Sequence, residues 1–165
     1  MYKKGIINYI VIILLLCIYT SVHAENISIG TSIYTKHLDD GDDLNESNDA
    51  IIIKYNNLFG STFVNSKYNR SWFFGYSFST KKYHLKLTFN DGIFKLTPIK
   101  NNDIFIRGNL YVGLLYGYGC DMPDIDGWTI GAAPTIEFGY KQLSLETMIM
   151  PLDGGVITSL VVWNF

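Results

Sequence analysis

The sequence predicts an all-β fold, an eight-stranded antiparallel barrel. After residue 24 no stretch has a convincing helical period, while short apolar or alternating runs recur with turn residues between them. Eight such runs are present, which suits a small closed barrel. The last run, GGVITSLVVWNF, alternates and ends on an aromatic residue.

Residues 1–24 are predicted to be a secretory signal peptide that is cleaved. Lys3 and Lys4 precede an apolar run from Ile6 to about Tyr19, and small side chains follow at the cleavage positions. A transmembrane anchor would need a longer apolar run of about 20 residues. The remaining domain, 25–165, is expected to be the barrel.

The composition of this domain excludes some classes of function. Without the leader, 11 basic residues stand against 15 acidic ones, so the net charge is near −4. Nucleic-acid binding needs a basic stripe and is not expected. Cys120 is alone after cleavage, so no internal disulfide forms. About 140 residues make one domain, large enough to enclose a core or a lumen.

Each of the eight runs is bounded by turn residues. The predicted strands are 26–38, 49–57, 59–66, 71–80, 104–118, 128–139, 142–150 and 155–165. The segment 81–103 is the exception. It is either a long strand that extends beyond the membrane or an added hairpin that turns at Asn90-Asp91-Gly92.

The links between the strands alternate in character. Polar links are expected at 39–49, 67–70, 119–127 and 152–155. The links near Leu58 and Lys141, at the opposite end, are short. Outer-membrane barrels show this asymmetry, with longer loops outside and tight turns in the periplasm.

The last strand carries the strongest indication of location. Phe165, Trp163, Val161, Ser159 and Ile157 lie on one face, and this pattern resembles the C-terminal signal by which outer-membrane barrels are recognised for assembly. The expected location is therefore the outer membrane of a Gram-negative cell, reached through the signal peptide. The alternative is a secreted β-sandwich, because soluble domains also alternate along half-buried strands.

The barrel interior is expected to be apolar. Ile51-Ile52-Ile53, Leu114-Leu115 and Val161-Val162 leave no polar lumen face, whereas porin-like strands alternate apolar out and polar in. An eight-stranded barrel has an interior that side chains fill or that holds one small ligand. The interior is therefore either a plugged core or a hydrocarbon-binding pocket.

At this point the chain resembles the lipid A palmitoyltransferase family, PagP, over nearly all of the mature chain. The resemblance rests on a few matches in order: His37 followed by Asn45-Glu46, the FVNS of residues 63–66, Trp72 with the GYSF of residues 75–78, and the spacing of Pro134 and Pro151. It implies an outer-membrane barrel, acting as a monomer without a cofactor, that moves an acyl chain from a phospholipid to the lipid A of lipopolysaccharide.

The resemblance also assigns roles to single residues. It implies that His37, Asn65 and Ser66 are catalytic, with Asn65 in place of the family's aspartate. Pro134 and Pro151 match a pair of prolines that loosens strand pairing and admits phospholipid laterally. The family's second pair is absent, with Ser32 and Asn48 in its place. Ser77 stands where a family glycine forms the floor of the acyl pocket, which implies a shorter chain than palmitate. The family's N-terminal amphipathic helix has no counterpart, since the first strand begins almost at Glu25.

The chemistry of these residue types supports an acyl-transfer site. Neutral His37 suits proton transfer near neutral pH, and Ser66 either attacks the ester or orients the substrate. Asn65 orients a histidine ring but does not stabilise the imidazolium, and loss of that charge in a serine triad costs about 10⁴ in rate. Asp39, two residues from His37, shares its strand face if the strand continues and offers partial rescue.

Other interpretations stay open at these positions. Ser66 and Ser71 are also ordinary residues for capping loop backbone. Lys67 and Arg70 either contact lipid phosphates or solubilise the loop. The acidic run 39–49 lacks the calcium-loop order, so no metal site is predicted, and His84 is expected to be structural. Three functions follow: a PagP-type acyltransferase, a non-catalytic barrel with a structural or surface-interaction role, and a phospholipase or deacylase that uses water as acceptor.

Overall fold

The computed structural model describes residues 27–38, 44–47, 49–90, 93–100, 103–118, 124–150 and 155–165. The strands are β1 (Ile27–His37), β2 (Ile51–Tyr55), β3 (Leu58–Val64), β4 (Arg70–Ser79), β5 (Tyr83–Asn90), β6 (Ile93–Pro98), β7 (Ile104–Tyr116), β8 (Trp128–Tyr140), β9 (Leu143–Met150) and β10 (Val156–Asn164). No helix long and apolar enough to span a membrane occurs in this part of the chain. The predicted signal peptide lies outside the described residues.

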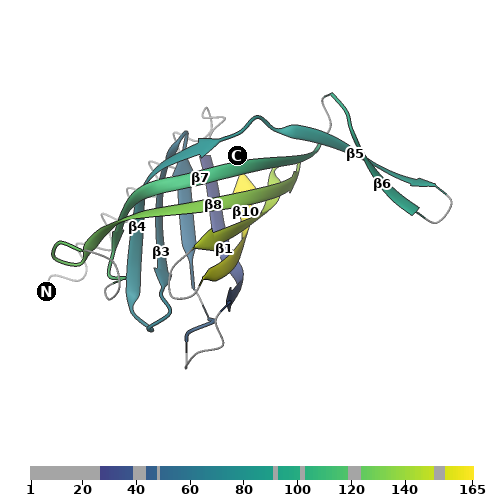
Figure 1. Ribbon diagram of the computed structural model, residues 1–165. Coiled ribbons are helices and arrows are strands. Elements are labelled where there is room, and N and C mark those ends of the chain that lie inside the picture. Colours follow the sequence, from purple (N-terminus) through teal and green to yellow (C-terminus); the bar gives the residue numbers. More distant parts are fainter. Residues whose placement is uncertain are drawn as a thin grey trace, which may run out of the picture.

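Eight of the strands close into an antiparallel barrel (Figure 1). Around the wall the order is β1, β2, β3, β4, β7, β8, β9 and β10, and β10 pairs with β1. The ring is completed where β4 pairs with β7 across the inserted segment. The predicted eight-stranded barrel is confirmed, with every predicted strand end within two residues of the observed one.

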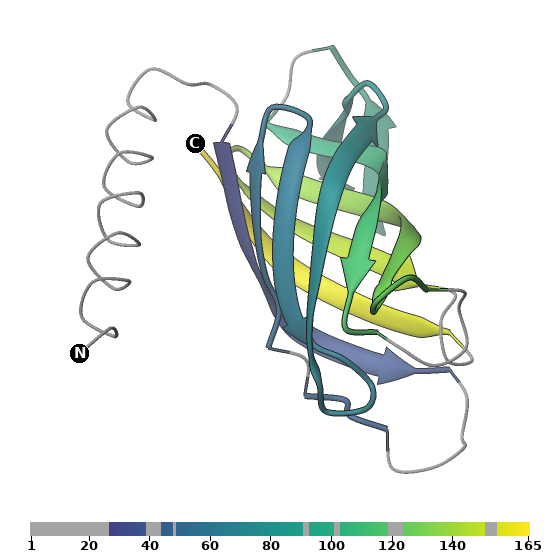
Figure 2. The ribbon, with the colours of Figure 1, turned by 90° about the vertical axis from the view of Figure 1, so that its left-hand side faces the viewer.

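The two ends of the barrel differ (Figure 2). The end that holds Ile27 and Phe165, whose backbones are hydrogen bonded at 2.8 Å, also holds the tight turns at 56–57 and 141–142; we call it the terminal end. At the opposite end β1, β3, β7 and β9 finish, and the described turn at 67–70 joins β3 to β4; we call it the loop end.

Residues 81–103 contain the added hairpin rather than one long strand. β5 and β6 pair antiparallel, and Asn90 pairs with Ile93 across the predicted turn Asn90-Asp91-Gly92. Asp91 and Gly92 lie outside the described residues. Only the first residues of β5, Tyr83 to Leu85, pair with β7. The rest of the hairpin projects beyond the barrel wall from the terminal end (Figure 1).

The seam that completes the ring depends on a pair of glycines. Gly75 of β4 lies opposite Gly113 of β7. A Cβ on Gly75 would lie 2.1 Å from the Val112 oxygen, and one on Gly113 would lie 1.9 Å from the Phe74 oxygen. The two backbones approach so closely that only glycine fits on either side.

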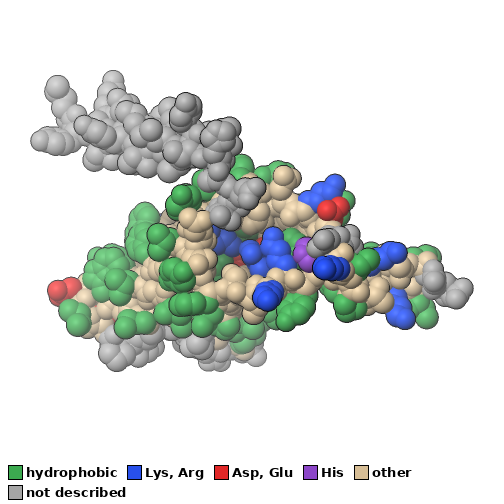
Figure 3. Space-filling model, turned by 90° about the horizontal axis from the view of Figure 1, so that it is seen from above, with side chains coloured by type: hydrophobic (Ala, Val, Ile, Leu, Met, Phe, Trp, Pro, Cys, Tyr) green, Lys and Arg blue, Asp and Glu red, His purple; other side chains and the backbone are tan. Residues whose placement is uncertain are grey.

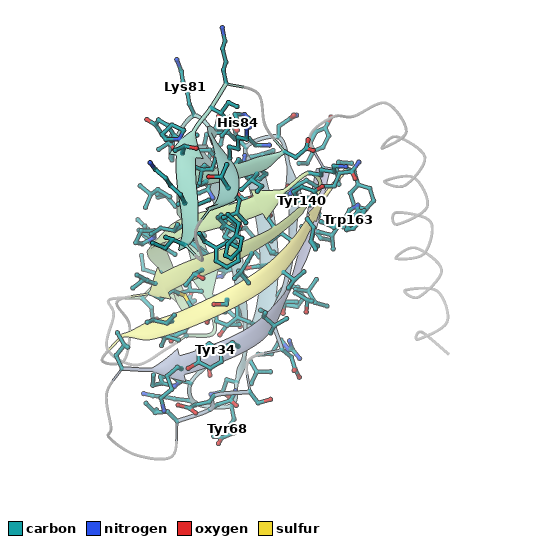
Figure 4. All side chains as sticks on the ribbon, turned by 90° about the vertical axis from the view of Figure 1, so that its right-hand side faces the viewer. Tyr34, Tyr68, Lys81, His84, Tyr140 and Trp163 are labelled. Atoms are coloured by element: carbon teal, nitrogen blue, oxygen red, sulfur yellow. The ribbon has the colours of Figure 1, made fainter. Side chains whose placement is uncertain are left out.

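The outer wall is apolar along its whole length. On β8 every second side chain points outward and is exposed, from Trp128 through Ile130 and Ile136 to Phe138 and Tyr140. The exposed tyrosines and tryptophans gather near the two ends: Figure 4 shows Tyr140 and Trp163 near the terminal end, and Tyr34 and Tyr68 toward the loop end. On β8, aliphatic side chains such as Ile130 and Ile136 lie between them, whereas the exposed side chains of β4 from Trp72 to Phe78 are aromatic throughout.

The middle of the interior is filled, and only its loop half is mainly apolar. Where two apolar residues are adjacent on a strand, one faces inward and the other outward. Ile52 and Leu115 point inward and are buried, while their neighbours Ile51 and Leu114 are exposed. In the terminal half, charged and polar side chains face the interior, including a buried Lys54. The prediction of an apolar lumen is therefore correct for one half of the barrel and wrong for the other.

Candidate active site

A β-bulge in β1 turns His37 toward the interior. The register of β1 against β10 shifts between Ser32 and Tyr34, so that Ile33 is an extra residue. Counting by twos from the inward-facing Ser28 along a regular strand would leave His37 on the outside. Because of the bulge, His37 is buried instead, at the last position of the strand.

The turn between β3 and β4 presents Ser66. Asn65 organises this turn, since its Oδ1 accepts hydrogen bonds from the backbone N–H groups of Lys67 and Asn69, both at 2.9 Å. Asparagine often builds turns in this way. From a neighbouring segment, the Asn45 N–H donates to the Ser66 carbonyl at 3.0 Å. Ser66 is thus fixed by its own turn and by the connection that follows β1.

The structure brings His37 and Ser66 together as a buried, hydrogen-bonded pair. His37 Nε2 lies 2.8 Å from Ser66 Oγ, and each residue is only 5% exposed. A base within hydrogen-bond reach of a hydroxyl is the geometry that an activated serine needs. The pair lies at the loop end, as the sequence predicts for the end of the first strand and the turn after the third.

Tyr118 is a third member of this cluster. Its hydroxyl lies 3.2 Å from Ser66 Oγ, and the residue is buried just after β7. Its ring also packs against Phe63, with 6.3 Å between the ring centres. Sequence reasoning missed Tyr118, because it is one of twelve tyrosines and no motif marks it.

Asn65 is next to Ser66 in the chain, but its amide bonds elsewhere. Besides accepting the two turn N–H groups, it donates through Nδ2 to Ser71 Oγ at 3.0 Å and to the Gly117 carbonyl at 2.9 Å. These bonds tie the β3–β4 turn to β4 and to the end of β7. The geometry therefore gives Asn65 a positioning role for Ser66.

The second ring nitrogen of His37 has a different environment. Nδ1 is buried and has no hydrogen-bond partner among the described residues. When Nε2 accepts a hydrogen bond from the Ser66 hydroxyl, Nδ1 carries the hydrogen of the neutral ring. The exposed Glu46 carboxylate is tied mainly to Lys36: its pKa is lowered first by a hydrogen bond from Lys36, and to a smaller extent by one from the His37 backbone N–H. Asp39, the predicted alternative partner, lies outside the described residues.

Lys67 and Arg70 flank this cluster on the surface. Both side chains are exposed on the β3–β4 turn, and Arg70 donates to the Asp49 carbonyl at 3.3 Å. They stand at the rim of the loop end, where the predicted phosphate contacts would be made. His84 lies at the other end of the molecule, on β5.

The wall of the barrel is not fully paired at the loop end. β8 pairs with β9 from Tyr140 only as far as Thr135, so within the described residues the ladder stops at Pro134. Proline lacks the N–H that would continue it. Its predicted companion, Pro151, lies outside the described residues.

A second gap lies between β1 and β2. Their ladder of backbone hydrogen bonds ends at Thr31. Two further hydrogen bonds join Ser32 and Ala50: the Ser32 N–H donates to the Ala50 carbonyl at 3.0 Å, and the Ala50 N–H donates to Ser32 Oγ at 2.9 Å. From Ile33 to His37 no described residue of β2 is paired with β1. The wall is therefore loosened on this side as well, although Ser32 takes the place of the proline that the resemblance to PagP implies.

The interior beneath His37 and Ser66 has little free space. The apolar cavity there, among side chains such as Phe63, Met148 and Leu160, measures about 30 Å³. A larger apolar concavity of about 390 Å³ lies on the outer wall, over β2, β3 and β4.

Ser77 lies in the other half of the barrel. It is buried on β4 and donates to the Asn57 carbonyl at the terminal end. It lines a polar cavity of about 470 Å³ together with Lys54 and Arg107. Packed rings of Phe59, Phe73 and Tyr111 occupy the middle of the interior. The residue predicted to form the floor of an acyl pocket therefore borders polar side chains.

Sequence reasoning missed a buried ionic network in this terminal half. The carboxylate of Glu146 is fully buried and accepts hydrogen bonds from Lys54, Asn109, Tyr111 and Thr135, at 2.6–3.0 Å. A second buried carboxylate, Glu137, pairs with Arg107. The signal was present in the sequence, as single charges at inward positions of apolar strands.

Comparison with known proteins gives no further assignment. No protein-family model matches the chain, and no curated protein is significantly similar to it. In the described part of the chain, no group of three or more histidine, cysteine, aspartate or glutamate side chains is placed to hold a metal ion. The His37–Ser66 pair is the feature on which a function can be argued.

Proposed function

We propose that the chain spans the outer membrane of a Gram-negative cell. The support is the outer wall, where exposed aliphatic side chains such as Ile130 and Ile136 lie between aromatic ones such as Trp128 and Tyr140. Outer-membrane barrels carry such an apolar band between aromatic girdles. The signal-peptide pattern of residues 1–24 agrees with export.

The proposed orientation follows from the two ends. The short turns, the start of β1 and the end of β10 lie at the terminal end, and in outer-membrane barrels the end with short turns faces the periplasm. The loop end, with His37 and Ser66, then faces outward. The cluster lies where the outer leaflet holds lipid A, beside the exposed cations of Lys67 and Arg70.

We propose further that this site transfers a fatty acyl chain from a phospholipid to lipid A. The observation that carries the proposal is the 2.8 Å contact between His37 Nε2 and Ser66 Oγ, buried at the loop end. The Tyr118 hydroxyl, 3.2 Å from Ser66 Oγ, supplies a donor for the developing oxyanion. The part of β8 that is not paired with β9, from Trp128 to Pro134, offers a lateral route for a lipid chain.

The proposed reaction needs no cofactor. Ser66 Oγ attacks the ester carbonyl carbon and passes its proton to His37 Nε2. The bond to the phospholipid oxygen breaks, and His37 returns the proton to that oxygen. A lipid A hydroxyl then attacks the acyl-serine, its proton passes by way of His37 to Ser66 Oγ, and Ser66 is released. If Ser66 only orients the substrate, the lipid A hydroxyl gives its proton to His37 and attacks the phospholipid ester directly; the bond from the acyl carbon to the phospholipid oxygen breaks, and His37 returns the proton to that oxygen.

A non-catalytic barrel is the second candidate, and three observations favour it. The Asn65 amide is used by the turn, and His37 Nδ1 has no hydrogen-bond partner among the described residues. The apolar cavity below the pair holds about 30 Å³, so an acyl chain enters only if side chains move or if it lies along the outer wall. A phospholipase would use the same pair with water as acceptor.

The masses of lipid A separate these candidates. The chain is expressed in a Gram-negative host that lacks such an enzyme, and lipid A is compared for the native form, His37→Ala and Ser66→Ala. Ser47→Ala, an exposed loop serine, is the matched control. An added acyl mass that both site variants lose and the control keeps supports the transferase.

Two other results point elsewhere. Unchanged lipid A with a correctly inserted barrel supports the non-catalytic candidate, and release of fatty acid alone supports the hydrolase. The role of Ser66 is tested separately with a fluorophosphonate probe, which labels a nucleophilic serine and leaves an orienting one unmodified. Labelling that survives Ser66→Ala would assign the nucleophile to another residue.

A further inference from the structure

The hairpin of β5 and β6 has two chemically different faces. In the register of the pair, Phe89 lies opposite Phe94 and Leu87 opposite Leu96, which puts these four side chains on one face. All four are exposed, between 48% and 69%, and the two phenylalanine rings touch with centres 4.7 Å apart. The apolar face thus has no cover within the described residues.

The opposite face of the hairpin is basic. Lys86 and Lys95 alternate with the apolar residues and so point the other way. Residues 81–100 contain five of the chain's 13 basic residues, against one acidic residue, Asp91. Seen from above, Lys and Arg side chains gather over the barrel mouth and along the hairpin (Figure 3). Ile93 and Ile99 are the apolar exceptions on this face.

The apolar face continues the outer wall of the barrel without a break. Tyr83 pairs with Ile106 and Leu85 with Ile104, so these side chains share the outer face of β7. The inward position between them, Phe105, is buried and pairs with His84. The basic face therefore continues the interior side of the wall, and the apolar face continues the side that we assign to lipid.

We propose that this hairpin lies along the periplasmic surface of the same membrane and binds anionic phospholipid. Its apolar face enters the acyl-chain boundary, and its lysines lie level with the headgroup phosphates. Two observations select lipid as the occupant: the apolar face is continuous with the proposed lipid-facing wall, and the other face carries the cations that anionic headgroups attract. The hairpin also extends sideways from the barrel mouth, as a surface anchor must (Figure 1).

This inference rests on the proposed membrane location and not on acyl transfer. The test uses the chain without its predicted signal peptide, refolded into vesicles of phosphatidylcholine with or without phosphatidylglycerol. In a Cys120→Ser background, single cysteines carry an environment-sensitive fluorophore at Phe94→Cys on the apolar face, Lys95→Cys on the basic face, and Ile136→Cys on the barrel wall. Quenching by acrylamide in water is compared with quenching by lipids that carry a quencher.

We expect the fluorophores at the adjacent positions 94 and 95 to differ in their exposure to water and lipid. Position 94 should behave like position 136, quenched by lipid and shielded from acrylamide, whereas position 95 should be several-fold more accessible to acrylamide. In vesicles with phosphatidylglycerol the shielding at position 94 should increase. Lys86→Gln with Lys95→Gln, measured at position 94, should remove that increase, since each lysine near an anionic surface contributes about fivefold in binding.

Three outcomes would overturn the inference, and they are distinguishable. If position 136 is lipid-buried while positions 94 and 95 are equally accessible to water, the hairpin does not lie on the membrane and the barrel assignment stands. If position 136 is also exposed to water, the membrane location itself fails. If position 94 becomes shielded only as protein concentration rises, whatever the lipid, then a second copy of the chain covers the face.

Discussion

Replacing Asn65 by aspartate tests whether this side chain serves the histidine or the turn. The resemblance to PagP implies that aspartate belongs here and that Asn65→Asp should raise activity, because the missing charge costs a serine triad about 10⁴ in rate. The structure predicts the opposite. Asn65 Nδ2 donates to the Gly117 carbonyl at 2.9 Å, and an aspartate would place an oxygen against that carbonyl.

The size of the effect follows from the four hydrogen bonds of Asn65. Aspartate keeps the two bonds accepted from the Lys67 and Asn69 N–H groups. The Ser71 hydroxyl can reverse and donate to the carboxylate, but the Gly117 carbonyl cannot donate. One buried hydrogen bond is therefore replaced by two opposed acceptors, which costs about 1–3 kcal/mol in the free energy of unfolding.

The measurement is chemical unfolding of the barrel in detergent, together with lipid A mass. Asn57→Asp is the matched control: the Asn57 amide donates to the Tyr76 hydroxyl at 2.6 Å on the exposed surface, and that hydroxyl can reverse. It should cost less than about 0.5 kcal/mol. At low pH the new carboxyl of the Asn65→Asp variant becomes protonated and can donate to the Gly117 carbonyl, so the stability deficit of this variant should shrink. An Asn65→Asp variant that is as stable as the native chain and adds more acyl groups would refute this assignment.

Three further predictions concern the rest of the fold. Glu146→Leu should lower the free energy of unfolding by about 3–5 kcal/mol, because it leaves the Lys54 charge buried and unpaired. Adding Lys54→Met should recover most of this loss in a double-mutant cycle. Equal losses in the single and double variants would contradict this prediction. Gly75→Ala should prevent closure of the barrel, because the added Cβ would lie 2.1 Å from the Val112 oxygen. The measurement is loss of the compact, heat-modifiable band on gels. The barrel of the control variant Gly60→Ala should still close, because the nearest neighbour of the added Cβ, at 3.2 Å, is a side chain. Tyr118→Phe should lower the acylation rate about 10²-fold or more, in line with loss of one oxyanion donor. Its free energy of unfolding should stay within about 1.5 kcal/mol of that of the native chain. An unchanged rate would show that Tyr118 is not part of the site.

The strands and the hairpin were predictable because they depend on local alternation and turn residues. Asp91-Gly92 lies between two alternating runs, and the chain reverses between Asn90 and Ile93 as such a dipeptide predicts. The inward position of His37 was not predictable in this way. It depends on one extra residue in β1, and the register of β1 against β10 that reveals this residue joins parts of the chain more than 120 residues apart.

The buried charges were missed for a different reason. Lys54, Glu137 and Glu146 each stand alone within an apolar strand, and the neighbouring doublets such as Ile51-Ile52-Ile53 suggested an interior without polar groups. A charge at an inward position is stable only with a partner that comes from another strand. For Lys54 that partner is Glu146, 92 residues away, so no local pattern identifies it.

The barrel separates the part that holds it together from the part that carries the candidate site. In the terminal half, β8 pairs with β9 and β1 pairs with β2 without interruption, and the Glu146 network crosses the interior. In the loop half both ladders stop among the described residues, and the interior is apolar. In the membrane location that we propose, an unpaired backbone group within hydrocarbon would cost several kcal/mol, so these gaps would have to meet water, headgroups or loops rather than acyl chains alone. They would then lie at the membrane boundary, the level at which a lipid ester would meet His37 and Ser66 and from which its chain would enter.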